Sequence, residues 1–147
     1  MNYLSYAKVL RPHQWVKNLL LFVPMILGHR YMDWDSLRSV TLGFLAFCMV
    51  ASSVYVINDL VDLESDRNNP AKRSRPFASG AIPTQHGLAL ILVPLTLGLG
   101  ISALVNPTFA AVIVCYFFIT LAYSTFLKRV LIADVVTLAM LYSVRIF

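Results

Sequence analysis

Three aspartates with helical spacing mark the most polar point of an otherwise apolar chain. Asp59, Asp62 and Asp66 follow one another at intervals of three and four residues, which places them within an arc of about 60° on one face of an α-helix. Carboxylates gathered in this way repel one another unless a cation lies among them. Hard divalent cations such as Mg²⁺ take oxygen ligands, and the preceding Asn58 adds a further carbonyl oxygen. The pattern predicts a divalent-cation site, and the alternative interpretation is a solvated acidic loop.

A basic run follows the aspartates directly. Its members are Arg67, Lys72, Arg73 and Arg75. Carboxylates that hold a metal beside cations that bind phosphate are what a diphosphate-bearing substrate requires. The alternative for the basic run is attraction to anionic lipid headgroups on the cytoplasmic face of a membrane.

The composition indicates a membrane protein. Hydrophobic residues make up 59% of the chain and charged residues 13%, whereas a soluble domain carries about a quarter charged residues. We therefore expect an all-α, polytopic transmembrane helix bundle, with membrane lipid around it and no nucleic acid as a partner. The whole of 1–147 is predicted to form a single domain. Apolar stretches of the length that crosses a bilayer predict five spans: Trp15–Tyr31, Ser39–Ile57, His86–Val105, Pro107–Phe126 and Leu131–Phe147.

The placement of Lys and Arg predicts the orientation of these spans. Basic residues gather in the N-terminal segment, in the loop of about 58–85, and in the turn that holds Lys128 and Arg129. Short loops rich in Lys and Arg face the cytoplasm. We therefore expect a multi-pass protein of the cytoplasmic (inner) membrane, with its N terminus and its Asp-rich loop on the cytoplasmic side.

These residues resemble a known family. The segments Asn58-Asp-Leu-Val-Asp-Leu-Glu-Ser-Asp-Arg67 and Lys72-Arg-Ser-Arg-Pro-Phe-Ala-Ser-Gly80 are similar to the first Asp-rich motif of the UbiA superfamily of intramembrane prenyltransferases. Arg11-Pro-His-Gln-Trp-Val-Lys-Asn18 and Tyr123-Ser-Thr-Phe-Leu-Lys128 resemble its decaprenyl-phosphate phosphoribosyltransferase branch, and Leu141-Tyr-Ser-Val-Arg145 does so less specifically.

The resemblance implies a fold, a metal and two substrates. Superfamily members have about nine transmembrane helices, and their two Asp-rich motifs hold Mg²⁺ and a diphosphate. The phosphoribosyltransferase branch transfers 5-phosphoribose from phosphoribosyl diphosphate to a polyprenyl phosphate, a step toward cell-wall arabinan. Asp59, Asp62 and Asp66 would then be the catalytic metal ligands. The implied substrate-binding residues are Lys17, Asn18, Asn58, Arg67, Lys72, Arg73, Arg75, Tyr123 and Lys128.

The C terminus departs from this pattern. The last predicted helix is incomplete at Phe147, and the second polar motif of the superfamily would lie beyond it. We therefore expect about five of nine helices, with a C-terminal half missing from this chain. Two other functions stay open: prenyl transfer from a polyprenyl diphosphate to an aromatic or quinone precursor, and a truncated, non-catalytic membrane subunit.

Overall fold

The computed structural model describes residues 3–125, and all regular secondary structure in this part of the chain is helical. This confirms the predicted all-α class. The elements in chain order are α1 (Tyr3–Val9), the 3₁₀ helix η1 (Pro12–Phe22), α2 (Val23–Leu27), α3 (Trp34–Val61), α4 (Leu63–Asn68), the 3₁₀ turn η2 (Thr84–His86), α5 (Gly87–Val105) and α6 (Pro107–Thr125).

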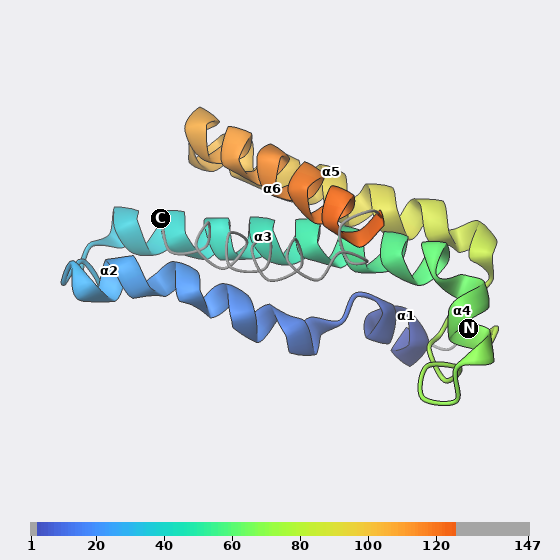
Figure 1. Cartoon of the computed structure of the whole chain (residues 1–147). Helices are drawn as coiled ribbons and strands as arrows, with labels where there is room; N and C mark the ends of the chain where they lie inside the picture. Colours follow the sequence, from blue (N-terminus) through green and yellow to red (C-terminus); the bar gives the residue numbers. More distant parts are fainter. Residues whose placement is uncertain (1–2, 126–147) are drawn as a thin grey trace.

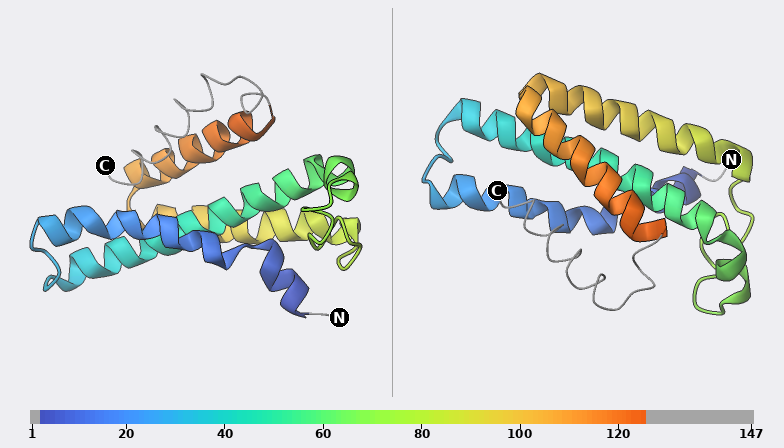
Figure 2. Two further views of the ribbon diagram at one scale, coloured as in Figure 1. Left: turned by 60° about the horizontal axis from the view of Figure 1, so that its bottom comes forward. Right: turned by 45° about the horizontal axis from the view of Figure 1, so that its top comes forward.

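Helix α3 lies at the centre of the bundle. It packs most extensively against α5 and also contacts α6 and η1. Figures 1 and 2 show η1 and α2 along one flank of α3, and α5 with α6 along the other. Three helical segments between residues 3 and 125 are long and apolar enough to cross a membrane: Trp34–Val61, Thr84–Val105 and Pro107–Ser124. They confirm the second, third and fourth predicted spans, and the protein is an integral membrane protein.

Glycines allow α3 and α5 to approach closely. A Cβ atom on Gly98 would lie 2.7 Å from Cγ2 of Val50 and 2.9 Å from the carbonyl oxygen of Ala46. A Cβ atom on Gly87 would lie 2.7 Å from Cδ1 of Leu60. Small residues at such contacts let helix backbones pack closely within a bilayer. The contact at Gly87 also places the start of α5 level with the end of α3.

The first predicted span, Trp15–Tyr31, is not confirmed as a continuous membrane helix. Pro24 has no backbone N–H, so it cannot donate the α-helical hydrogen bond to Leu20. The Leu20 carbonyl oxygen instead accepts a shorter-range bond from the N–H of Val23. The segment consequently divides into η1 and α2, and α2 ends at Leu27. The fifth predicted span, Leu131–Phe147, lies outside the described residues.

The polar segments gather at one end of the bundle. Figure 1 shows α1, α4 and the start of α5 at this end, with the α2–α3 link and the α5–α6 turn at the other. Val9 of α1, Val56 of α3, and Phe77 and Ile82 of the loop after α4 form a buried cluster here. This cluster fixes the loop after α4 against the end of α3, where the candidate site lies.

Candidate active site at the end of helix α3

Two of the three aspartates are buried on either side of a helix break. Helix α3 ends at Val61 and α4 starts at Leu63, with Asp62 between them. The carboxylate of Asp59 is 2% exposed and that of Asp66 is 1% exposed, whereas Asp62 is half-buried. The prediction of a single uninterrupted helix face is therefore wrong. The break turns the chain, and Asp59 and Asp66 nevertheless converge.

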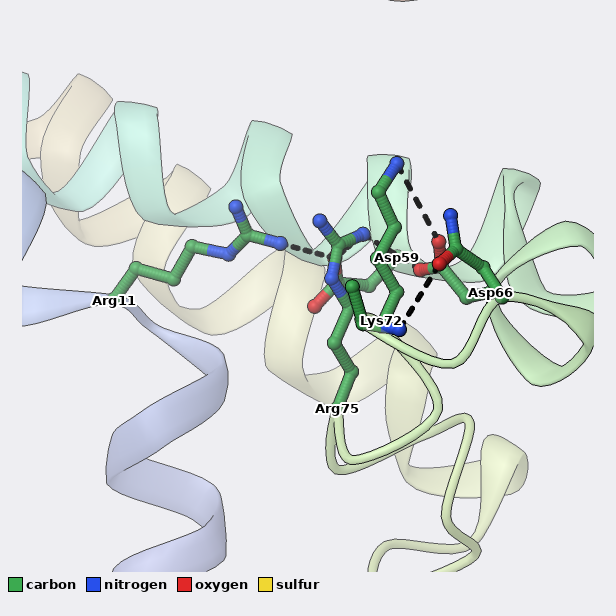
Figure 3. Close-up of polar contacts among 7 residues, drawn as sticks. Arg11, Asp59, Asp66, Lys72 and Arg75 are labelled. Atoms are coloured by element: carbon green, nitrogen blue, oxygen red, sulfur yellow. Dashed lines mark hydrogen bonds and ion pairs between the residues drawn. The ribbon is translucent and has the colours of Figure 1, made fainter.

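Arg75 joins these two carboxylates. Its Nη1 atom donates to Oδ2 of Asp66 at 2.6 Å and to Oδ1 of Asp59 at 3.3 Å. Arg11 approaches the same oxygen of Asp59 from the other side, and its Nη2 atom lies 2.5 Å from Oδ1. Figure 3 shows Arg11 reaching across from the N-terminal segment while Arg75 rises from the loop between the carboxylates. The Nη1 atom of Arg75 thus lies where a cation shared by the carboxylates of Asp59 and Asp66 would lie.

One oxygen of this group keeps an open coordination position. Oδ1 of Asp66 is buried and has no hydrogen-bond partner among residues 3–125. The Nζ atom of Lys72 lies 3.9 Å away, beyond hydrogen-bond distance, and the Lys72 side chain is 46% exposed. A buried carboxylate oxygen without a donor is costly, so this atom is suited to a cation that arrives with a ligand.

Local structure selects Arg75 from the basic run. Arg73 donates its backbone N–H to the Asn69 carbonyl, and Arg75 donates to that of Lys72, which forms tight consecutive turns. Phe77, which is 1% exposed, anchors the loop two residues later. Arg75 consequently points toward the carboxylates, while Arg73 remains exposed.

Arg11 is a site residue that the sequence-based assignment missed. Its backbone has φ 50° and ψ 54°, the left-handed region, which costs a non-glycine residue about 1–2 kcal/mol. Its guanidinium carbon lies 5.3 Å from the centre of the Tyr55 ring, within the range of a cation–π contact. The signal available in the sequence was its position at the start of the Arg-Pro-His-Gln-Trp motif. Its partner Asp59 is 48 positions away, which no local pattern reveals.

The structure does not bring every predicted residue to the carboxylates. Asn18 is 2% exposed and its side-chain N–H donates to Sγ of Cys48 at 3.3 Å. Cys48 precedes Asp59 on α3 by eleven positions, or about 16 Å along the axis. Asn18 therefore packs deeper in the bundle, and its exposed neighbour Lys17 lies on the same segment. Lys128 lies outside the described residues. Of the other predicted residues, Asn58 near the end of α3 and Tyr123 near the end of α6 are half-buried, and Arg67 on α4 is exposed.

The donor set fits a divalent cation held together with substrate. Between residues 3 and 125, no three His, Cys, Asp or Glu side chains are gathered closely enough to hold a metal by themselves. Mg²⁺, however, typically binds through one or two carboxylates and completes its shell with water and substrate phosphates. Asp59 and Asp66 supply such a pair, and the open oxygen of Asp66 supplies a ligand position. Displacement of Arg75 from between them would leave the carboxylates for the metal and the guanidinium for a phosphate.

Comparisons with known proteins identify a family and several similar proteins. Residues 15–147 match the UbiA prenyltransferase family. The uncharacterized protein y4nM of Sinorhizobium fredii is 45% identical over 97% of this chain and 28% of its own length. The nodulation protein NoeC of Azorhizobium caulinodans is 37% identical over 98% of this chain and 47% of its own length. The decaprenyl-phosphate phosphoribosyltransferase of Mycobacterium tuberculosis is 34% identical over 95% of this chain and 47% of its own length. The chain thus spans less than half of each of these relatives.

Proposed function

Because this chain belongs to the UbiA prenyltransferase family, we propose that it forms the donor-binding part of a Mg²⁺-dependent membrane transferase. The reaction is transfer of 5-phosphoribose from phosphoribosyl diphosphate to a polyprenyl phosphate. The observation that carries the proposal is the convergence of Asp59 and Asp66 on the single Nη1 atom of Arg75. A relative of 34% identity named for this reaction supports the choice of substrates.

The charges around the carboxylate pair suit a leaving diphosphate. Mg²⁺ held by Asp59 and Asp66 would neutralise the charge that develops on the departing group. Arg75 donates to both carboxylates, and the Nζ atom of Lys72 lies 3.9 Å from Asp66, so both cations would lie near the same phosphates. Hydrogen bonds between arginine and phosphate are charge-assisted and often bidentate. Arg75 is therefore the residue best placed to hold the diphosphate as the reaction proceeds.

The proposed chemistry needs positioning more than proton transfer. The anomeric carbon of the donor loses its bond to a diphosphate oxygen and gains a bond to an oxygen of the acceptor phosphate. The bonding electron pair leaves with the diphosphate. Because the acceptor phosphate is already anionic, no general base has to remove a proton. A site made of carboxylates and cations, such as Asp59, Asp66, Arg11 and Arg75, is consistent with this requirement.

The polar end of the bundle suggests from which side each proposed substrate would enter. Phosphoribosyl diphosphate is water-soluble and would arrive from the cytoplasm, where the basic residues of the N-terminal segment and of the loop after α4 are expected to lie. Polyprenyl phosphate would enter from the lipid. A counterpart of the part of the relatives that this chain does not cover would complete the cavity.

A transfer assay with the full-length protein tests the proposal. Membranes containing it are incubated with either labelled phosphoribosyl diphosphate or labelled geranylgeranyl diphosphate, and label is counted in the lipid fraction. We expect Mg²⁺-dependent labelling of polyprenyl phosphate from the first donor, abolished by EDTA and by Asp66→Asn. The exposed neighbour provides a matched control, because Glu64→Gln should retain the rate. Transfer only from the prenyl donor would replace the proposal with prenyl transfer, and transfer from neither would favour the non-catalytic subunit.

A further inference from the structure

A pocket lies beside the carboxylate pair, on the side of α1. Its volume is about 600 Å³, and Asp59 forms part of its wall. The other residues that line it come from α1, from the link to η1 and from the loop after α4: Leu4, Ala7, Lys8, Arg11, Pro12, His13, Ser74, Arg75 and Pro76. This volume lies within the range of small-molecule sites.

The lining of this pocket is electropositive. Lys8, Arg11 and Arg75 carry three permanent positive charges, and Asp59 carries the one carboxylate. His13 adds a ring nitrogen. Clefts in which one sign of charge predominates concentrate ligands of the opposite sign. Because Arg75 is also paired with Asp66, Lys8 and Arg11 are the cations of the lining that can attract an anion.

Each of the two arginines uses only some of its N–H donors in contacts with carboxylates. Among residues 3–125, Arg11 donates to a carboxylate only through Nη2, and Arg75 only through Nη1. A guanidinium has five N–H donors in a planar fork, so each arginine retains donors after its carboxylate contact. The carboxylate of Asp59 thereby orients Arg11 for an anion that binds on its other edge.

The backbone at Arg11 supports a binding role. A residue held in the left-handed region is strained, and such strain concentrates at functional sites. At Arg11 it turns the chain between α1 and η1 so that the guanidinium reaches Asp59 and stacks near Tyr55. Glycine would adopt this turn without strain, but it would provide no guanidinium.

We infer that this pocket binds a phosphate monoester through Lys8, Arg11 and His13, beside the diphosphate that Asp59, Asp66 and Arg75 would hold. The inference deepens the proposed function and rests on it, because a phosphoribosyl donor carries a 5-phosphate in addition to its diphosphate. The same chemistry is found in the headgroup of a lipid phosphate monoester. The two sources differ in solubility, which an experiment can separate.

Lys8 offers a variant that leaves the carboxylate contacts intact. Within the described part of the chain it is exposed and forms no ion pair. We expect Lys8→Gln to weaken binding of a phosphate monoester by about tenfold to a hundredfold, the usual effect of losing one charge-assisted contact. Arg11→Gln should weaken it at least as much. Arg38→Gln, at the other end of α3, is the matched control and should bind as the wild type does.

The test uses the full-length protein in phosphatidylcholine nanodiscs. Ribose 5-phosphate is titrated by calorimetry, with ribose as the uncharged control, and dioleoyl phosphatidic acid is added to a second set of nanodiscs as the lipid probe. Lys8-dependent binding of ribose 5-phosphate assigns the pocket to a soluble donor. Lys8-dependent binding of phosphatidic acid alone assigns it to a lipid headgroup. Absence of both, or affinities that Lys8→Gln does not change, would overturn the inference.

Inorganic diphosphate with Mg²⁺ separates this inference from the proposed function. Lys8→Gln should bind it with wild-type affinity, because the diphosphate depends on Asp59 and Asp66. If the wild-type protein does not bind diphosphate in the presence of Mg²⁺, the proposed function is refuted. The inference of a monoester pocket is not affected by that result. Equal weakening of both ligands by Lys8→Gln would refute the separate pocket.

Discussion

Replacement of Arg75 tests whether the carboxylate pair needs a cation between its members. In Arg75→Gln, two buried carboxylates lose the nitrogen that lies 2.6 Å from Asp66 and 3.3 Å from Asp59. Removing one partner of a buried ion pair costs about 3–5 kcal/mol. The Arg75 side chain is 27% exposed, and Arg11 still contacts Asp59, so we take the lower end, about 3 kcal/mol. At about 2–4 °C per kcal/mol for a chain of this size, the loss in Tm is about 6–12 °C.

The assay is thermal unfolding of the full-length protein in nanodiscs, followed by tryptophan fluorescence with and without Mg²⁺. A ligand that binds the folded state raises Tm, and Mg²⁺ no longer competes with Arg75 in the variant. We therefore expect Mg²⁺ to raise the Tm of Arg75→Gln more than that of the wild type. Arg73→Gln, from the same loop but exposed, should change stability by no more than about 0.5 kcal/mol. An Arg75→Gln protein that melts with the wild type would refute the placement of Arg75 between the carboxylates.

Three further outcomes are expected. A cysteine introduced at Asn69 should be protected from a membrane-impermeant thiol reagent in intact cells and one at Asn106 should react; the reverse pattern would invert the orientation. Gly98→Ala should destabilise the protein by about 1–3 kcal/mol through overpacking, whereas Gly100→Ala, with open space around its Cβ, should not, and equal Tm values would contradict the close helix contact. Hydrogen bonds from the Ser36 hydroxyl and a backbone N–H lower the pKa of Asp33 below its ordinary 3.8. The wild type should therefore be more stable than Asp33→Asn above that pH, and the difference should shrink as the pH falls below it. A difference in stability that does not depend on pH would refute the ionic cap.

The sequence predicted the three long helices because their apolar runs are continuous. The predicted span, Ser39–Ile57, marks only the apolar part of the central helix, which begins earlier, at Trp34. That first turn is held by the cap at Asp33, whose side chain accepts from the N–H of Asp35. Capping is a matter of a few polar atoms, which a search for hydrophobic length does not detect.

The sequence singled out the aspartates and the basic run, but it did not predict their geometry. The intervals between Asp59, Asp62 and Asp66 are compatible with one helix, so they cannot reveal a break at the middle residue. Four cations in the basic run were equally suitable by sequence, and only the turns of the loop and the buried anchor Phe77 single out Arg75. The contact from Arg11 depends on how α1 and α3 pack, which is a tertiary property.

The close contact between Gly87 and Leu60 sets the level of Asp59 relative to helix α5. Helix α5 has 19 residues and a length of about 28 Å, close to the hydrocarbon thickness of about 30 Å. A helix of this length that spans the hydrocarbon ends at its edges, so we expect Asp59, next to Leu60, to lie at one edge of the hydrocarbon. In the proposed reaction, a water-soluble sugar phosphate and a lipid-borne phosphate would meet at this level, and neither would have to cross the hydrocarbon. Helix α3, with 28 residues, is about 42 Å long and therefore exceeds this thickness.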